Sequence, residues 1–172
     1  MSDYEEFLKS KIRKHVDSGF TVDKETLPPR LFPFQRDIVA WALKRGRAAI
    51  FAQTGLGKSF MESAWANAVH EHTGGNVLIL APLAVAGQMV REATKFGIPA
   101  KQCSEQSDVS SGITVTNYEK LHKFDLSKFV GVVLDESSIL KSFDGKTRTM
   151  LIRHFEDVRY RSTWTATPAP ND

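Results

Sequence analysis

The stretch RAAIFAQTGLGKS, from Arg47 to Ser59, decides the expected fold of this chain. Its first part, residues 48–52, is a short apolar run of the kind that forms a buried parallel strand. The residues after Ser59 place apolar side chains at helical spacing, at positions 60, 61, 64, 65, 68 and 69. A strand, a glycine-containing loop, a lysine, a hydroxyl and a helix in this order predict a phosphate-binding loop.

The residue types in this loop suit an anion. Gly55 and Gly57 allow backbone angles that other residues avoid, and they let main-chain N–H groups approach a phosphate. The helix that begins near Lys58 directs its unpaired N–H groups to the same point. The Lys58 ammonium is placed to reach the β- and γ-phosphates, and the Ser59 hydroxyl to ligate Mg2+. The first position of the usual GxxxxGK[ST] pattern is Ala52 here, and the alternative interpretation is an ordinary glycine turn.

Length and composition indicate one globular domain. The chain has 172 residues, of which 41% are hydrophobic and 25% charged. No apolar run approaches the roughly 20 residues of a membrane span, and the polar N-terminus is not a secretion signal, so no membrane partner is expected. The single cysteine, Cys103, excludes an internal disulfide and fits a reducing, cytoplasmic compartment, a bacterial host cytoplasm included. The net charge of +3 permits nucleic-acid binding but does not argue for it.

The N-terminal residues form a separate piece in the sequence pattern. Residues 2–16 predict an amphipathic helix that begins with a capping box of Ser2 and Glu5. Residues 20–33 contain three prolines and predict an extended connection. We therefore expect an accessory segment over residues 1–30 and the main domain over residues 31–172.

The main domain alternates between strand and helix patterns. Strands are predicted over residues 76–81, 113–116, 129–134 and 161–166. Helices are predicted from Pro33 to a stop at Gly46 and over residues 83–96, 118–122 and 147–155. The polar stretch 101–112 carries no periodicity. Such alternation predicts an α/β domain of three layers around a mostly parallel sheet, with ligands beyond the carboxyl ends of the strands.

Two further motifs follow predicted strands. Asp135 and Glu136 follow the apolar run 129–134, where a magnesium nucleotide site needs one acid to hold the ion and another to deprotonate water. The hydroxyls of Thr165 and Thr167 end the next strand, where they are placed to bond these acids and to sense the γ-phosphate. Taken alone, the acids are equally well explained as a solvated turn, and the threonines as a strand that stops at Pro168.

The set of motifs carries a family resemblance. The segments AQTGLGKS, APLAVAGQ, TNYEKL, DESS and TATPAPND resemble, in order and spacing, motifs I, Ia, Ib, II and III of superfamily-two helicases and translocases. LFPFQ, which contains Gln35, resembles the glutamine element that reads adenine. The resemblance covers residues 31–172 and implies the first RecA-like lobe, a P-loop NTPase fold. GLGKS, NYEKL and the TPxxN of residues 167–171 look most like Swi/Snf-type double-stranded DNA translocases, short phage-encoded members included.

The resemblance implies cofactors, partners and a role for each matching residue. ATP and Mg2+ are the implied cofactors, and DNA, duplex rather than single-stranded, is the implied partner. Gln35 would read adenine, Ser59 and Asp135 would hold the metal, and Lys58, Asp135 and Glu136 would be catalytic. The residues that would hold the triphosphate are Gln53, Thr54, Gly55, Leu56, Gly57, Lys58 and Ser59. Those that would line a nucleic-acid track are Pro82, Leu83, Gln88, Thr116, Asn117 and Tyr118. Thr165 and Thr167 would couple hydrolysis to movement.

This sequence also departs from the family pattern. Motif II reads DESS instead of DEAH or DEAD, which keeps both acids, and the tryptophan common in motif Ia of Swi/Snf relatives is replaced near Gln88. The family carries motifs IV to VI and its arginine fingers on a second RecA-like lobe, for which no sequence follows Asp172. Because an arginine finger contributes about 10³–10⁵ in rate, we expect little ATP hydrolysis unless a second lobe is supplied. A nucleotide-regulated binding module and an RNA helicase lobe remain alternatives to a DNA motor lobe.

Overall fold

The computed structural model describes residues 16–141, 149, 153 and 155–167. The predicted helix over residues 2–16, most of the helix over 147–155 and the TPxxN residues after Thr167 lie outside the described residues. Everything below concerns the described part of the chain.

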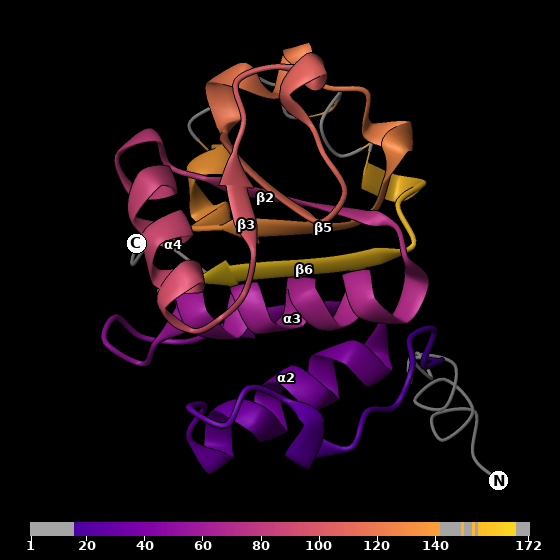
Figure 1. Ribbon diagram of the computed structural model, residues 1–172, viewed down its shortest axis with the longest axis vertical. Helices are drawn as coiled ribbons and strands as arrows, with labels where there is room; N and C mark the ends of the chain where they lie inside the picture. The colour runs from indigo at the N-terminus through magenta and orange to yellow at the C-terminus, as the bar shows by residue number, and fades with distance from the viewer. Residues whose placement is uncertain (1–15, 142–148, 150–152, 154, 168–172) are drawn as a thin grey trace, which may run out of the picture.

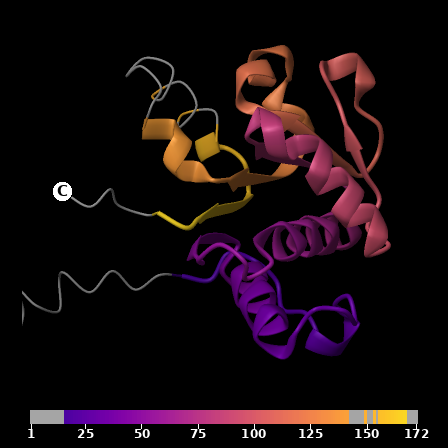
Figure 2. The same cartoon turned by 90° about the vertical axis from the view of Figure 1, so that its left-hand side faces the viewer.

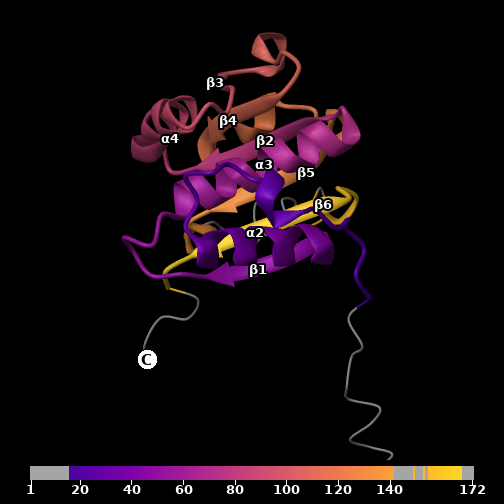
Figure 3. The ribbon, with the colours of Figure 1, turned by 60° about the horizontal axis from the view of Figure 1, so that its bottom comes forward.

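The centre of the molecule is a six-stranded sheet in which every pairing is parallel. Across the sheet the order is β1-β6-β5-β2-β4-β3, which Figure 3 shows from one edge to the other. The strands are β1 (Arg47–Phe51), β2 (Asn76–Ala81), β3 (Ala100–Gln102), β4 (Ile113–Asn117), β5 (Phe129–Asp135) and β6 (Tyr160–Thr165). The predicted α/β fold with a mostly parallel sheet is confirmed.

Helices cover both faces of this sheet. The helices are α2 (Pro33–Arg45), α3 (Lys58–Thr73) and α4 (Leu83–Lys95), and they pack on one face. Figures 1 and 2 show α2 lying along α3, which separates it from most of the sheet. The short 3-10 helices are η1 (Lys24–Thr26), η2 (Gln106–Asp108), η3 (Tyr118–Lys123), η4 (Leu126–Lys128) and η5 (Ser137–Lys141). Side chains of η3, η4 and η5 pack against the opposite face, which completes three layers.

Strand β2 contributes side chains to two hydrophobic cores, one on each face of the sheet. Its side chains alternate between faces, as the period of a strand requires. Val77, Ile79 and Ala81 join the core beneath α2, α3 and α4, while Leu78 and Leu80 join the core beneath the 3-10 helices. All five are fully buried. Burial of each large side chain stabilises the fold by about 1.5–3 kcal/mol relative to exposure.

Two strands differ from the sequence prediction. The pattern predicts β1 as a buried strand, but β1 lies at one edge of the sheet and buries only Ile50 among its own residues. At the other edge, β3 forms inside a stretch that carries no strand signal, because Lys101 and Gln102 are exposed. β3 forms because it pairs with β4, although its own sequence pattern does not predict a strand.

The connection before α2 is packed onto the main domain. The N–H of Phe20 donates to the carbonyl of Leu43 in α2 at 3.1 Å. Leu27 and Leu31 are buried in the same core as α2 and α3. The predicted boundary between residues 30 and 31 stays a prediction, and the described part of the connection belongs physically to the fold.

Candidate nucleotide site

The predicted site lies where three neighbouring strands end. β1, β6 and β5 are adjacent and parallel, so their carboxyl ends meet at one edge of the sheet. The loop after β1 is tied to β6 directly, because the N–H of Ala52 donates to the carbonyl of Thr165 at 3.1 Å. Asp135 ends β5 beside them. The fold therefore brings the glycine loop, the acidic pair and the threonines together.

The glycine loop needs its glycines for two separate reasons. Gly55 has φ 86° and Gly57 has φ 74°, in the left-handed region that other residues adopt only with strain. At Gly57 a side chain would also collide, since a Cβ there would lie 2.5 Å from Nε2 of Gln35. A Cβ at Gly55 would meet no atom within 4 Å. Helix α3 begins directly after Gly57, so its first N–H groups face the loop.

Gln35 connects this loop to the start of α2 through hydrogen bonds. Its side chain is buried, and its two ends bond to main chain on both sides: Oε1 accepts from the N–H of Phe32 at 2.9 Å, and Nε2 donates to the carbonyl of Leu56 at 2.9 Å. Its predicted role in reading adenine stays a prediction, because in this arrangement the amide is already engaged by the protein.

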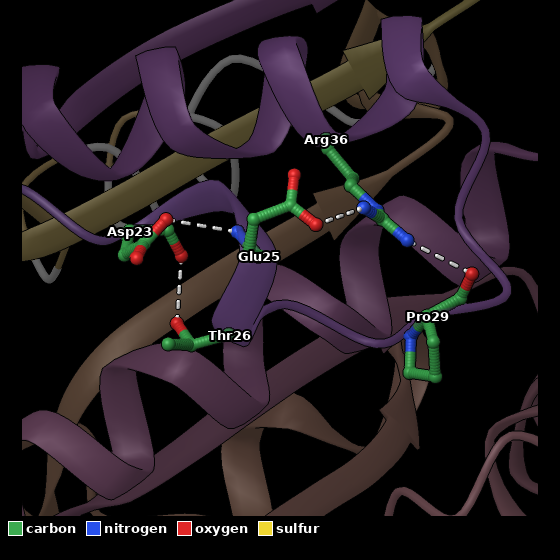
Figure 4. A network of polar contacts seen from close by, with 5 residues as sticks. All are labelled: Asp23, Glu25, Thr26, Pro29 and Arg36. Carbon is green, nitrogen blue, oxygen red and sulfur yellow. Dashed lines mark hydrogen bonds and ion pairs between the residues drawn. The ribbon is translucent and has the colours of Figure 1, made fainter.

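Polar contacts tie the preceding connection to the first turn of α2 (Figure 4). Asp23 caps η1, with its carboxylate accepting from the N–H of Glu25 at 3.0 Å. Arg36 then joins this turn to α2: one nitrogen bonds the Glu25 carboxylate at 3.1 Å, and another donates to the carbonyl of Pro29 at 2.9 Å. The connection and the first turn of α2 are thus fixed together next to the loop.

The other loop residues are mostly exposed. The ammonium of Lys58 crosses the loop and donates to the carbonyls of Ala52 at 3.0 Å and Gln53 at 3.3 Å. Lys58 and Ser59 are half-buried. The loop residues that are exposed are Gln53, Thr54, Gly55, Leu56 and Gly57. Lys58 therefore ties the two ends of the loop together through main-chain carbonyls.

Glu136 is held by hydroxyl groups. The hydroxyl of Thr165 donates to its carboxylate at 2.7 Å, that of Thr167 at 3.4 Å, and Ser138 donates to the same oxygen. The predicted bonds from Thr165 and Thr167 to the acids of β5 are thus confirmed. Partial burial raises the pKa of Glu136, but the bonds from Ser138 and Thr165 outweigh it and leave the pKa of this carboxyl below its ordinary value.

The backbone of Glu136 is also unusual. Its φ of 47° is left-handed, and Glu136 is the non-glycine residue with this feature among those the structure describes. Such angles are sparsely populated by side chains other than glycine, asparagine and aspartate, and they cluster at functional sites. The turn sends the Glu136 side chain back toward the end of β6.

Asp135 lies in a different environment from its neighbour. It is 7% exposed, and burial raises the pKa of its carboxyl above the ordinary value. Behind it stands Glu62 of α3, which is fully buried and whose pKa is raised by burial first and by the charge of Asp135 second. The hydroxyl of Tyr118 closes this side and donates to the main-chain carbonyl of Asp135 at 2.7 Å.

The described residues contain no cluster of three acids, histidines or cysteines placed to hold a metal ion by themselves, so a magnesium ion here would take a carboxylate together with phosphates and water. Three carboxyl groups, those of Glu62, Asp135 and Glu136, interact with the single ammonium of Lys58. Carboxylate oxygens are ligands that Mg2+ prefers, and it usually takes one or two of them together with phosphates and water.

The residues predicted to line a nucleic-acid track divide into two groups. At the start of α4, Leu83 is 63% exposed, Gln88 is exposed and Pro82 is half-buried. At the end of β4 the three predicted side chains are buried, and each bonds inside the protein. Thr116 donates to the Cys103 carbonyl at 2.9 Å, Asn117 accepts from the Lys120 N–H at 3.0 Å, and Tyr118 bonds Asp135 as described.

Sequence reasoning did not single out two residues of this site, Glu62 and Ser138. Ser138 belongs to the DESS motif, where the sequence departs from the family pattern, and its hydroxyl bonds Glu136. Glu62 lies among apolar residues of α3, and an acid inside an otherwise buried helix was the available signal.

Comparison with known proteins gives one family. The family model described as DEAD/DEAH box helicase matches residues 32–172. A protein of Caenorhabditis elegans, a "SWI/SNF-related matrix-associated actin-dependent regulator of chromatin subfamily A-like protein 1 homolog", is 32% identical over 142 residues, which cover 74% of this chain and 20% of that protein.

Solved structures share the fold. A crystal structure of the UvsW helicase from bacteriophage T4 matches with a TM-score of 0.69 at 18% identity, covering 96% of this chain and 59% of the chain in that structure. The Sulfolobus solfataricus SWI2/SNF2 ATPase core, solved in complex with dsDNA, matches with a TM-score of 0.66 at 19% identity over 87% of this chain and 34% of that one. The chain thus spans only part of each relative. None of the helices in its described part has the length and apolar character needed to cross a membrane.

Proposed function

The chain belongs to the DEAD/DEAH box helicase family, and from this premise we propose that residues 31–172 are the ATP-binding motor lobe of a Swi/Snf-type DNA translocase or helicase. The observation that carries the proposal is the meeting of Lys58, Asp135 and Glu136 at the ends of adjacent strands, with Thr165 bonded to Glu136. Neither a glycine turn nor a solvated acidic turn requires this convergence.

The proposed chemistry follows from the state of each side chain. The loop N–H groups and Lys58 bind the phosphates once Lys58 exchanges its bonds to Ala52 and Gln53. Mg2+, held from Ser59 and Asp135, supplies positive charge against the β- and γ-phosphates when it is bound. Glu136 is kept ionised by its hydroxyl neighbours, so it is ready to accept the proton of the attacking water.

The link between hydrolysis and movement is proposed to run through β6. Thr165 bonds Glu136, and Thr167 bonds both Glu136 and the hydroxyl of Ser138. A change at the γ-phosphate that moves Glu136 therefore acts directly on the chain that leaves β6. We propose that a second RecA-like lobe, in the same or another chain, receives this signal and completes the site.

Duplex DNA is the proposed substrate, on the strength of likeness to proteins of Swi/Snf type. The exposed residues at the start of α4, Leu83 and Gln88, are the contacts that we retain, together with Pro82. For Thr116, Asn117 and Tyr118 the proposal is limited to main-chain contacts, because their side chains are committed inside the protein. The buried free thiol of Cys103 suits a reducing, cytoplasmic setting.

The test is ATP turnover by the chain combined with a second RecA-like lobe, in the presence of duplex DNA, single-stranded DNA or single-stranded RNA. The proposal predicts the strongest stimulation by duplex DNA. Equal or stronger stimulation by RNA contradicts the choice of substrate and favours an RNA helicase. ATP binding that alters partner affinity without turnover favours a nucleotide-regulated binding module.

A further inference from the structure

Strand β1 lies at an edge of the sheet, although its sequence is typical of a strand with neighbours on both sides. Residues 48–52 are an apolar run. Among the described residues, β6 is the strand that pairs with β1, and it does so without a bulge (Figure 3). Edge strands usually carry lysine, proline or a bulge, which discourage further pairing. β1 has none of these features, so its free edge is open to another strand.

This free edge exposes hydrogen-bonding groups of the main chain. The N–H of Ala52, directly after β1, donates to the carbonyl of Thr165 of β6 at 3.1 Å. Because the main-chain groups of successive residues in a strand point to opposite edges, those of Arg47, Ala49 and Phe51 point away from β6. All three residues are exposed, and the side chain of Phe51 is exposed with them.

A hollow lies on each side of β1, and Arg47, Ala48 and Ala49 line both hollows. The α2-side hollow has a volume of about 250 Å³ and is completed by Trp41 and Arg45 of α2. The η5-side hollow has a volume of about 390 Å³ and is mostly apolar. Residues of β5, β6 and η5 complete it, Leu134, Thr163 and Leu140 among them. Since side chains of a strand alternate between faces, those of an added strand would enter the two hollows in turn.

The charge beside this edge is positive. Arg47 lies opposite Arg161 of β6 in the register of the two strands, and like charges in that arrangement destabilise a sheet. Burial first, and the charge of Arg47 second, lower the pKa of Arg161. Glu156 and Asp157 act on Arg161 in the opposite direction. No ion pair among the described residues involves Arg47, so a carboxylate beside Arg47 would relieve the repulsion.

We propose that the free edge of β1 binds an extended segment of a partner protein, which adds one strand to the sheet, places alternate side chains in the two hollows and sets an acidic residue beside Arg47. A polypeptide offers N–H and C=O groups at the spacing of this edge, whereas a nucleic acid does not. Pairing with a second copy of the chain is disfavoured, because it would bring two positively charged edges together. The inference is independent of the proposed function, since it uses no residue of the nucleotide site.

The probe for this edge is the capped peptide acetyl-Asp-Val-Thr-Val-Thr-Asp-amide. Its β-branched residues favour an extended strand, and its two acids serve either strand direction. Fluorescence anisotropy of a labelled copy measures its affinity for the full chain. Ala49→Pro removes an N–H that points away from β6, so the pairing with β6 is retained. Arg47→Gln removes the charge, and Arg91→Gln is the matched control, because Arg91 is an exposed arginine of α4.

We expect Ala49→Pro to weaken peptide binding by about tenfold or more, because a hydrogen bond is lost and the proline ring obstructs the edge. Arg47→Gln should weaken binding by about two- to fivefold. A peptide with asparagine in place of both aspartates should bind the unsubstituted chain and Arg47→Gln equally. Arg91→Gln should bind the original peptide as the unsubstituted chain does. Binding that is undetectable at millimolar peptide, or that Ala49→Pro leaves unchanged, overturns the inference.

Hydrogen exchange is a second measurement that needs no substitution. The N–H groups of Ala49 and Phe51 should exchange rapidly in the free chain and slowly with the peptide bound, whereas that of Ile50 should be slow in both states because it faces β6. Slow exchange at Ala49 and Phe51 in the free chain would mean that the edge is already covered, and it overturns the inference. Self-association of the chain that Ala49→Pro abolishes identifies a second copy as the occupant and overturns the proposed partner.

Discussion

Asp135 and Glu136 are neighbours in the sequence, yet they occupy opposite environments. Glu136 is half-buried among hydroxyl groups that lower its pKa, while Asp135 is buried, and this burial raises the pKa of its carboxyl. The difference teaches how one strand end supports two tasks. In the proposed mechanism the ionised, partly exposed acid accepts the proton of water, and the buried acid beside it ligates the cation.

The largest expected effect separates the two acids. Glu136→Gln should lower ATP turnover by about 10²–10⁴ in the lobe completed by a second one, because the group that accepts the proton of water is lost. Mg2+-dependent ATP affinity should stay near that of the unsubstituted chain. Asp135→Asn should instead weaken that affinity. Single-turnover kinetics and calorimetric titration measure the two quantities.

The proposed division of roles between Asp135 and Glu136 fails if both substitutions change ATP turnover and Mg2+-dependent ATP affinity in the same way. Retained turnover in Glu136→Gln would remove it as the base. Unchanged Mg2+ dependence in Asp135→Asn would remove that residue as the metal ligand.

A smaller effect is expected from substitutions in the glycine loop. Gly57→Ala and Gly55→Ala each introduce a left-handed alanine, which costs about 1–2 kcal/mol, but a Cβ at Gly57 also meets Gln35 at 2.5 Å. The Gly57 variant should therefore lose additional stability of about 1 kcal/mol, the contribution of one hydrogen bond such as that from Gln35 to Leu56.

Because the main chain of this loop is proposed to hold the phosphates, Gly57→Ala should weaken ATP binding both with and without Mg2+. Denaturant unfolding and nucleotide titration check this prediction. Equal stability of the Gly55 and Gly57 variants would show that the contact with Gln35 does not matter.

The smallest expected effect concerns the environment of Glu136. Thr165→Val removes the hydroxyl that bonds its carboxylate at 2.7 Å and should lower stability by about 1 kcal/mol near neutral pH. The pKa of Glu136 is lowered by folding, so its bonds stabilise the fold above the unfolded value of 4.5 and this contribution is lost as the pH falls through the folded pKa.

The gap in stability between Thr165→Val and the unsubstituted chain should therefore narrow below pH 4.5. Thr163→Val, the same substitution two residues earlier on β6, is the control. Urea unfolding between pH 3 and pH 7 measures the gap, and a constant gap over that range would mean that Thr165 does not act through the charge of Glu136.

Sequence pattern predicts the centre of the fold well because its strands alternate regularly with helix patterns. β2, β4 and β5 are buried on both faces, β6 is half-buried at Arg161 and Thr163, and the bounds of all four agree with the prediction within one residue. The pattern fails at the two edges of the sheet. β1 has the composition of a central strand but an edge position, and β3 is created by its partner instead of by its own residues.

The candidate site was predictable in its motifs and not in its contacts. Residue type and spacing identify Lys58, Asp135 and Glu136, because phosphate and magnesium chemistry requires those groups. The engagement of Gln35 by Leu56 and the burial of Thr116 depend on side-chain packing, which no local pattern encodes. Glu62 was hidden for the same reason, because its complete burial depends on how α3 packs against other elements.

The measurement that tests the central claim most directly is the titration of ATP and Mg2+ into the unsubstituted chain and into Lys58→Ala. The account predicts binding by the unsubstituted chain and its loss in the variant, since Lys58 is the loop's one side-chain cation for the phosphates. Equal ATP affinity in the two proteins would contradict the assignment of this strand edge as the nucleotide site.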